Sequence, residues 1–367
     1  RVVGLTVEAT GIAAEIGAQC VIETNNGGTA IEAEVVGFDG KHLYLMPIHY
    51  LEGIRAGSLV RFKQAQSLCG VGEKMLGRVI NGLGEPIDGK GPIAYDAEVA
   101  LDAKAINPME RGEVKDVLDT GIKAINGCLT FGKGQRMGLI AGSGVGKSVL
   151  MGMLTRNTAA DVVVIGLIGE RGREVQEFVQ KTLGEAGLAR AVVIAAPVDV
   201  SPVMRIKAAK LTHSVAEYFA AKGNDVLLLF DSLTRVAHAQ REIGLAVGEP
   251  PTTKGYTPSV FSLLPKLIER VGVGPGPQGS ISAFYTVLAE GDDRSDPIVD
   301  IARATLDGQI MLSRELADAA HYPAIDLEGS ISRVATNLVS ADQLRLAQRL
   351  RRYWTLYAQK QDLIQVG

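Results

Sequence analysis

The stretch Ala141-Gly142-Ser143-Gly144-Val145-Gly146-Lys147-Ser148 decides which fold this chain is expected to have. It follows a short apolar run at residues 136–141 and leads into a segment that can form a helix. A Gly-rich turn between a strand and a helix, ending in Lys and Ser, is typical of a phosphate-binding loop. Backbone N–H groups of such a turn converge on phosphate oxygens, and the helix N-terminus adds positive potential. The alternative is an ordinary Gly-rich turn, since the strict motif has Gly where Ala141 stands.

Apolar runs around this loop predict a parallel β-sheet. Each run is short and almost entirely apolar, as expected of strands that are buried on both faces. A helix lies between two of them, because Ser201 can cap it, Pro202 suits its first turn and Gly223 ends it. Strands that alternate with helices indicate an α/β fold with helices on both faces of the sheet. The predicted strands are residues 136–141, 161–168, 191–196, 226–230 and 280–288.

The chain is expected to contain three regions. Short β-branched segments separated by turns, such as the one at residues 25–28, predict a small N-terminal β-barrel over residues 1–66. Residues 67–100 include many Gly and Pro residues and predict a linker at the start of a core that extends over residues 67–340. Residues 341–367 predict a helix that closes the chain.

Composition and charge narrow the possible functions. Lys plus Arg total 38 against 41 Asp plus Glu, so the chain lacks the basic excess of a dedicated nucleic-acid binder. The longest apolar runs are too short to span a bilayer, and no secretory signal opens the chain. The three cysteines are far apart, and we interpret them as reduced thiols of a cytosolic protein. Because the first residue is Arg1 rather than Met, we expect residues to be missing before it.

The phosphate-binding loop and one acid predict a nucleotide site with a metal ion. Lys147 would reach the β- and γ-phosphates, and the Ser148 hydroxyl would bind Mg²⁺. Asp231 directly follows the run at residues 226–230, at the edge where parallel sheets bind ligands. It is a candidate for holding Mg²⁺ through water beside Ser148. The alternative is that Asp231 simply caps the next helix.

A second pair of charged residues follows the apolar run at residues 162–168. Glu170 is well placed to orient and polarise an attacking water, and Arg171 to touch the γ-phosphate. Adjacent Glu and Arg residues are, however, usually a solvated surface pair. These two residues alone are therefore a weak signal.

Longer motifs resemble a known family. AGSGVGKS (141–148), GLIGERGREV (166–175), LLLFDSLTRVAHAQREIGLAVGEPPTTKGY (227–256) and YPAIDLEGSISRV (322–334) are similar to the export ATPases of flagella and type III secretion systems. These ATPases are relatives of the catalytic and non-catalytic subunits of rotary ATP synthases. The likeness covers nearly the whole chain, and LYLMP (43–47) and AFYTVLAEGDD (283–293) favour the flagellar branch. The resemblance implies a RecA-like P-loop ATPase core, with a small β-barrel before it and the start of a truncated helical C-terminal domain after it.

The resemblance also implies roles for particular residues. Glu170 matches the family's catalytic carboxylate, which is typically Gln in non-catalytic subunits, and Asp231 matches its Mg²⁺-linked aspartate. Tyr322 matches the aromatic residue that stacks on adenine, although by itself it would be interpreted as a core tyrosine. Arg333 matches the arginine finger that enters the neighbouring subunit's site, and its alternative is a surface arginine paired with an acid. The implied nucleotide-binding residues are Gly142, Ser143, Gly144, Val145, Gly146, Lys147, Ser148, Val149 and Tyr322.

The family resemblance implies a Mg²⁺-dependent ATP hydrolase that works as a ring, expected to be a homohexamer, in flagellar protein export. Its expected location is the cytoplasm, at the periphery of the inner-membrane export apparatus. The implied partners are a regulator protein, a coiled-coil stalk protein, the export gate in the membrane, and export substrates with their chaperones. No nucleic-acid partner is expected.

Three other functions remain open at this level. The chain could be the ATPase of a virulence (injectisome) type III secretion system. A hexameric RNA-dependent ATPase motor would need aromatic and basic residues interleaved on the barrel, and Phe38, Tyr44, Tyr50 and Phe62 are sparse. A nucleotide-binding structural subunit without turnover is the third.

Overall fold

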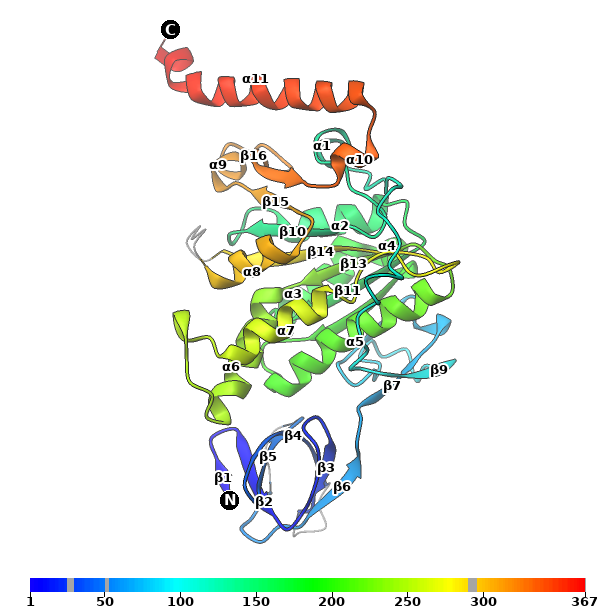
Figure 1. The fold of residues 1–367 in the computed structure, drawn as a ribbon, viewed down its shortest axis with the longest axis vertical. Coiled ribbons are helices and arrows are strands. Elements are labelled where there is room, and N and C mark those ends of the chain that lie inside the picture. The colour runs from blue at the N-terminus through cyan, green and yellow to red at the C-terminus, as the bar shows by residue number, and fades with distance from the viewer. Residues whose placement is uncertain (25–29, 50–52, 290–295, 367) are drawn as a thin grey trace.

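The computed structural model describes the whole chain except residues 25–29, 50–52, 290–295 and 367. The predicted turn at 25–28, Tyr50 and the last residues of the 283–293 motif therefore lie outside the described residues. A small β-structure at the N-terminus, an α/β core and a C-terminal helix follow one another along the long axis of the molecule (Figure 1). Within the described residues, no helix has both the length and the apolar character needed to cross a bilayer.

The N-terminal region is a six-stranded antiparallel sheet that curls around its own core (Figure 1). Its strand order is β1-β2-β5-β4-β3-β6. Alternate residues of β4 are buried, which is the pattern of a strand with one face on a core. The strands are β1 (Val2–Val3), β2 (Thr6–Thr10), β3 (Gln19–Ile22), β4 (Ile31–Asp39), β5 (His42–Pro47) and β6 (Val60–Gln64).

The core is built on an eight-stranded sheet with the order β16-β15-β10-β14-β13-β11-β12-β8. All its neighbouring strands run parallel except β15 and β16, which form an antiparallel pair at one edge. The strands are β8 (Arg78–Ile80), β10 (Arg136–Ala141), β11 (Val162–Ile168), β12 (Ala191–Ala196), β13 (Val226–Asp231), β14 (Ile281–Leu288), β15 (Gly308–Leu312) and β16 (Ile325–Ser332). Every residue of β11, β12 and β13 is buried, as their apolar sequences predict.

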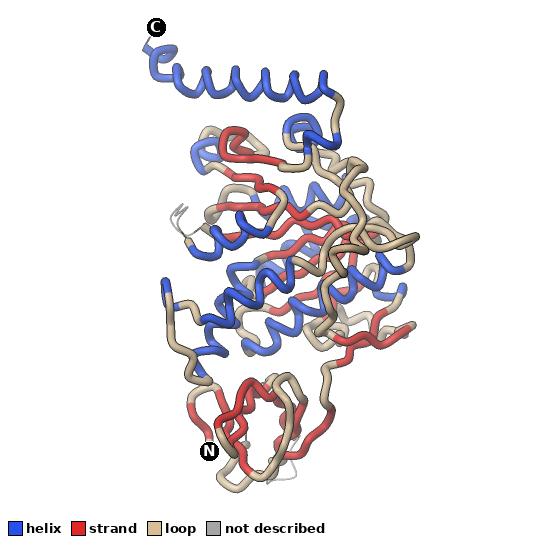
Figure 2. The backbone as a smooth tube through the Cα atoms, in the orientation of Figure 1, coloured by secondary structure: helices blue, strands red, loops and turns tan. Residues whose placement is uncertain are grey.

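Helices cover both faces of this sheet, as Figure 2 shows. One face packs on α5 (Pro202–Ala221), α6 (Leu233–Ala246), α7 (Pro258–Ile268) and α8 (Pro297–Thr305). The other packs on α1 (Lys123–Cys128), α2 (Lys147–Asn157), α3 (Gly172–Glu177), α4 (Gly184–Ala189) and α9 (Arg314–Asp318). A π-helical segment, η2 (Phe178–Leu183), joins α3 to α4, and the short 3-10 turns are η1 (Glu73–Met75) and η3 (Thr253–Gly255).

The last elements are α10 (Ala335–Leu338) and the long helix α11 (Ala341–Val366), which lies across the top of the molecule in Figure 1, above β16 and α9. Its apolar side chains are mostly exposed, because little of the described chain packs against them. Leu344 and Trp354 are partly buried, and the centroid of the Trp354 ring lies 5.6 Å from that of His321. The exposed residues of this face include Leu346, Leu350, Tyr353 and Tyr357.

Polar contacts between α5 and the N-terminal region join the first region to the core. The Lys207 ammonium is almost fully buried and lies 2.6 Å from a Glu34 carboxylate oxygen of β4. It also donates a 2.5 Å hydrogen bond to Ser67. Ser201, at the start of α5, donates to the carbonyl of Ile48. The barrel is thus attached to the same helix that covers the sheet.

The strands predicted from the apolar runs agree with the structure within one residue at each end. The predicted helix after Ser201 is α5, and Ser201 caps it by accepting a hydrogen bond from the Met204 N–H. Residues 67–100 are more regular than the predicted linker. They contain β8, which extends the large sheet, and a two-stranded sheet of β7 (Leu68–Val71) and β9 (Ala97–Ala100). The pair β15–β16 also has no counterpart among the predicted strands.

Candidate active site

The Gly-rich loop connects β10 to α2, as the sequence predicts. Gly144 and Gly146 have φ angles of 78° and 91°, which L-residues with side chains rarely adopt. Gly146 is the N-cap residue of α2, so the loop leads directly into the helix N-terminus. Ala141 still belongs to β10, where it pairs with Leu288, and therefore needs no positive φ. This position explains why Ala is accepted in place of the Gly of the strict motif.

Three charged side chains, which we call the catalytic cluster, meet beside this loop. The Lys147 Nζ atom lies 2.6 Å from Oδ1 of Asp231 and 3.2 Å from Oε1 of Glu170. All three are mostly buried, with exposed side-chain fractions of 13%, 5% and 14% for Lys147, Asp231 and Glu170. Buried charges are stable only when they are paired, so each acid and the ammonium hold one another in this position.

The pKa shifts of the cluster follow from two carboxylates facing one ammonium. Burial alone would lower the pKa of Lys147, but the nearby charges of Asp231 and Glu170 outweigh it and raise that pKa. Burial raises the pKa of the Asp231 carboxyl, and the charge of Glu170 acts in the same direction. An additional cation at this place would relieve the excess of negative charge.

The order of the strands brings these residues together. Asp231 ends β13, and its neighbour β11 ends at Ile168, two residues before Glu170. The Gly169 N–H donates to the carbonyl of Ala196, and the Val198 N–H donates to the carbonyl of Glu170. The end of β12 therefore fixes the backbone that carries Glu170. All these groups lie at the carboxyl edge of the parallel strands, where open α/β sheets bind ligands.

The structure excludes two of the alternative interpretations. Ser232, not Asp231, caps α6, because its hydroxyl accepts a hydrogen bond from the Arg235 N–H. Tyr322 is not a core tyrosine, since 62% of the residue is exposed. Its ring lies against the loop, and a Cβ atom added to Gly146 would be 3.6 Å from it.

Other predicted site residues lie outside the catalytic cluster in this structure. Ser148 is exposed on the first turn of α2, and Val149 beside it is 60% exposed. Arg171 points to solvent, with 77% of its side chain exposed and a 3.5 Å contact to Glu174. Arg333 follows β16 at the far edge of the sheet and donates a hydrogen bond to the carbonyl of Arg303. The roles assigned to these four residues therefore remain predictions.

Three polar residues near the loop were not singled out from the sequence. Thr286 of β14 donates a 2.6 Å hydrogen bond to Oδ1 of Asp231. Arg314 of α9 donates to the carbonyl of Ser143. Arg235 lies over Gly169, and its Nε atom is buried without a hydrogen-bond partner among the described residues. Its position four residues after Asp231, one turn into a helix that starts at the carboxyl edge, is the signal that would have identified it.

The donor set fits a Mg²⁺ ion that arrives with a nucleotide. In the described part of the chain, no group of three or more His, Cys, Asp or Glu residues is arranged to hold a metal ion. Asp231 and Glu170 nevertheless already accommodate a cation, the Lys147 ammonium, between them. Proteins usually hold Mg²⁺ with one or two carboxylates, water and the phosphates of the substrate.

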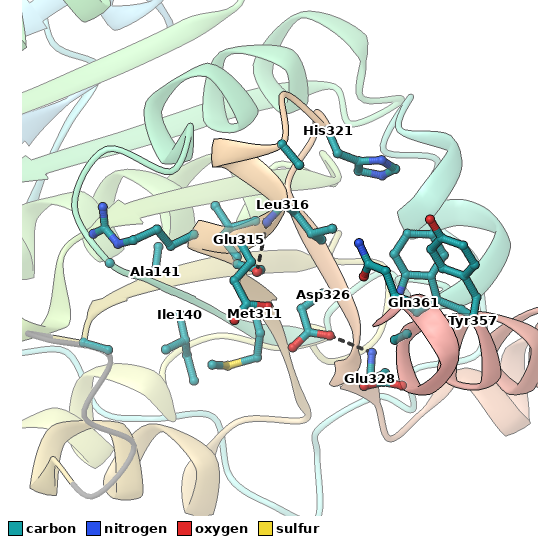
Figure 3. Close-up of a pocket in the computed structure, with 18 of the residues that line it drawn as sticks. Ile140, Ala141, Met311, Glu315, Leu316, His321, Asp326, Glu328, Tyr357 and Gln361 are labelled. Atoms are coloured by element: carbon teal, nitrogen blue, oxygen red, sulfur yellow. Dashed lines mark hydrogen bonds between the residues drawn. The ribbon is translucent and has the colours of Figure 1, made fainter. Parts of the chain in front are cut away.

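A cavity of about 850 Å³ adjoins the start of the loop (Figure 3). Ala141 lies at one end, Glu315 and Leu316 of α9 form one wall, and Tyr357 of α11 borders the other end (Figure 3). Its polar lining includes Asp326 of β16, whose carboxylate accepts from the Glu328 N–H. The long C-terminal helix thus contributes to the surroundings of the nucleotide loop.

Comparisons with known proteins agree with this architecture. Residues 1–64 match the β-barrel domain of the ATP synthase alpha/beta family, and residues 121–332 match the nucleotide-binding domain of the same family. The chain is 55% identical over 369 residues to a flagellum-specific ATP synthase of Pseudomonas aeruginosa, covering all of this chain and 82% of that protein. It is 49% identical over 367 residues to a type 3 secretion system ATPase of Xanthomonas euvesicatoria, covering all of this chain and 83% of that protein.

A solved structure shows the same fold. The assembled ATPase EscN of the enteropathogenic E. coli type III secretion system superposes with a TM-score of 0.93 at 41% identity, covering all of this chain and 88% of that one. A second structure, of assembled EscN in complex with its central stalk EscO, gives a TM-score of 0.90 at 40% identity, with 100% and 87% covered. The chain therefore belongs to the ATP synthase alpha/beta family and, within it, stands among the flagellum-specific and type III secretion ATPases.

Proposed function

We propose that this protein is a Mg²⁺-dependent ATP hydrolase that energises or assists protein export by the flagellar type III apparatus. The observation that carries the proposal is the catalytic cluster, in which Lys147 of the phosphate-binding loop lies between Glu170 and Asp231. A flagellum-specific relative that is 55% identical over the whole chain supports the flagellar system. The injectisome remains the second candidate, because the type 3 secretion ATPase of Xanthomonas euvesicatoria is 49% identical.

The residues of the cluster suit phosphoryl transfer to water. The loop N–H groups and Lys147 would bind the phosphates, and Glu170 would orient the attacking water in line with the leaving oxygen. Asp231 and the Ser148 hydroxyl would hold Mg²⁺, which when bound neutralises negative charge on the phosphates. Tyr322, exposed and lying against Gly146, would stack on the base. Arg171 would approach the γ-phosphate after turning inward from its present position.

Arg333 supports a mechanism that needs a second subunit. It is exposed at the edge of the sheet after β16, and its hydrogen bond goes to Arg303 rather than to the loop of its own chain. We infer that it completes the site of a neighbouring subunit in a ring, which we expect to be a hexamer. A relative, EscN, has been solved as an assembled ATPase, which supports an oligomer.

The same relatives support the cellular location and the partners that we propose. We place the protein in the cytoplasm at the inner-membrane export apparatus, with a stalk protein in the ring, as EscN binds the central stalk EscO. The remaining proposed partners are the regulator protein, the export gate, and export substrates with their chaperones.

Replacement of Glu170 by Gln tests the catalytic assignment. The amide keeps the size of the side chain but cannot accept a proton, so ATP turnover should fall by about 10²–10⁴-fold. Binding of nucleotide should change little, because Lys147 and the loop remain. Phosphate release and binding of a fluorescent ATP analogue measure the two effects on the same preparation.

Unchanged turnover in Glu170→Gln would mean that the chain uses another base or is a structural subunit. Measuring phosphate release with and without RNA tests the third candidate, an RNA-dependent ATPase motor. Strong stimulation by RNA would favour a nucleic-acid motor over an export ATPase. Complementation of a flagellar and an injectisome deletion strain decides between the two export systems.

A further inference from the structure

We propose that Thr286 is a positioning residue that holds the Asp231 carboxylate in the orientation required for binding Mg²⁺–nucleotide. This inference rests on the proposed function, since it gives Asp231 its metal-linked role. Thr286 itself touches neither substrate nor metal in the proposal. It acts only through the carboxylate that its hydroxyl contacts.

The position of Thr286 in the sheet brings it to the centre of the site. It lies on β14, which pairs with β10, the strand before the loop, and with β13, the strand that ends at Asp231. The residue is fully buried, and its Oγ1 atom donates a 2.6 Å hydrogen bond to Oδ1 of Asp231. Lys147 contacts that same oxygen at 2.6 Å. Thr286 of β14 and Lys147 at the start of α2 therefore both donate to the same carboxylate oxygen of Asp231.

The two donors differ in what nucleotide binding does to them. Lys147 is on a long flexible side chain and, in the proposed function, turns to the phosphates when the nucleotide binds. Thr286 has one side-chain torsion and lies inside the sheet, so its hydroxyl stays in place. After the ammonium has moved away, the Thr286 hydroxyl still fixes the rotation of the Asp231 carboxylate. That rotation decides where the second oxygen of Asp231 points.

The surroundings of Thr286 indicate that its hydroxyl is present for its hydrogen bond and not for packing. Its partner across β10 is Leu139, and its neighbour on the same face of β14 is Phe284, so this layer of the sheet is apolar. A buried hydroxyl in such a layer is costly unless it is hydrogen-bonded. Valine has nearly the same shape and would suit the layer better if packing alone mattered. The polar atom is explained by its contact with Asp231.

Three variants of the full-length protein test the proposal. Thr286→Val removes the hydroxyl but keeps the shape, and Thr286→Ser restores the hydroxyl. Thr212→Val is the matched control, because Thr212 is also fully buried but donates to the Ala208 carbonyl of α5. For each we would measure the dissociation constant of a fluorescent ADP analogue, once with Mg²⁺ and once with EDTA.

We expect Thr286→Val to weaken binding of the analogue about tenfold with Mg²⁺ and to leave binding in EDTA unchanged. Thr286→Ser should recover most of the loss, and Thr212→Val should match the wild type in both conditions. Equal weakening with and without Mg²⁺, or no weakening at all, would overturn the positioning role.

A parallel measurement on Asp231→Asn separates this inference from the proposed function. If Asp231→Asn abolishes the effect of Mg²⁺ and Thr286→Val does not reduce it, the role of Thr286 alone is wrong. If Asp231→Asn retains the full effect of Mg²⁺, the metal-linked role of Asp231 is wrong and the role of Thr286 falls with it.

Discussion

Two buried polar clusters lie on opposite faces of the same sheet, and they are organised differently. In the catalytic cluster, Lys147 faces two carboxylates, so negative charge is in excess. On the other face, the cluster formed by His213, Glu217, Arg270 and Tyr285, here called the α5 cluster, is internally balanced. Arg270 binds both carboxylate oxygens of Glu217, at 2.7 and 2.8 Å.

The histidine of the α5 cluster is equally well satisfied. Its Nδ1 lies 2.8 Å from the carbonyl of Ala209, which can only accept, so this nitrogen carries the proton. Its Nε2 therefore accepts the hydrogen bond from the Tyr285 hydroxyl at 2.9 Å. Tyr285 and Thr286 are consecutive residues of β14 whose side chains serve opposite faces. One strand, β14, therefore contributes to the catalytic cluster on one face of the sheet and to the stabilising α5 cluster on the other.

The largest expected effect is the loss of ATP turnover when the ammonium is removed from the catalytic cluster. Lys147→Ala removes the positive charge that would contact the phosphates, so ATP turnover should fall to background. The fold should survive, because an acid can take up a proton in place of the lost partner. Phosphate release and circular dichroism measure the two properties. Turnover near the wild-type level would refute the proposed site.

The next effect concerns whether one chain contains a complete active site or needs Arg333 of a neighbouring subunit. Arg333→Ala should lower turnover by about 10³–10⁵-fold if the guanidinium stabilises charge on the transferred phosphoryl group. Because we expect Arg333 to act in a neighbour, mixing Arg333→Ala with Lys147→Ala should restore part of the activity. Specific activity of the wild type should also rise with protein concentration.

A control is available for the trans mechanism. Arg345→Ala changes an exposed arginine of α11 that pairs with Asp342, and it should leave turnover unchanged. The trans mechanism is wrong if Arg333→Ala alone retains activity, or if the mixed variants are no more active than the two variants separately. It is also wrong if the specific activity of the wild type does not depend on concentration down to monomeric samples.

The α5 cluster should respond to substitution in stability and not in chemistry. Arg270→Met leaves Glu217 without its partner, and we expect a loss of about 3 kcal/mol in the free energy of unfolding. Turnover per folded molecule should be unchanged. Lys266→Met, at an exposed position of α7, is the matched control and should cost less than about 0.5 kcal/mol. Urea denaturation checks both values, and equal costs would remove the contrast between the clusters.

The smallest predicted effect is a pH dependence of stability. Burial, aided by the charge of Arg270, lowers the pKa of His213 from 6.5 to about 3. The unfolded chain therefore binds a proton below pH 6.5 that the folded chain refuses, and stability is lost as the pH falls from 6.5 toward 3. Between pH 7 and pH 5 this amounts to about 2 kcal/mol.

His213→Gln provides the comparison for this prediction, because its amide can meet both hydrogen-bond partners and does not titrate. The free energy of unfolding of the variant should depend less on pH than that of the wild type. Identical pH profiles would show that His213 does not titrate in the unfolded chain as expected. Urea denaturation at several pH values makes the measurement.

Local sequence was enough to predict many parts of this molecule. The apolar strands, the helix capped by Ser201 and the loop before Lys147 each depend on residues adjacent in sequence, so their patterns are visible in it. The strands β8 and β16, at the two edges of the large sheet, and β15, next to β16, were not predicted. Their own sequences are only partly apolar, and whether such segments form strands depends on the neighbour they pair with. The contacts of Thr286 and Arg314 were missed because each joins residues that are far apart in the sequence.

The sequence by itself determined that the chain has a phosphate-binding loop between a buried strand and a helix, with acids placed just after two other buried strands. Only the tertiary structure decided that Lys147, Glu170, Asp231 and Thr286 meet at one point, although 84 residues separate Lys147 from Asp231 and 55 separate Asp231 from Thr286. The physical reason is that periodicity and capping are properties of neighbouring residues. The order of strands in a sheet is instead a property of how the whole chain buries its apolar surface.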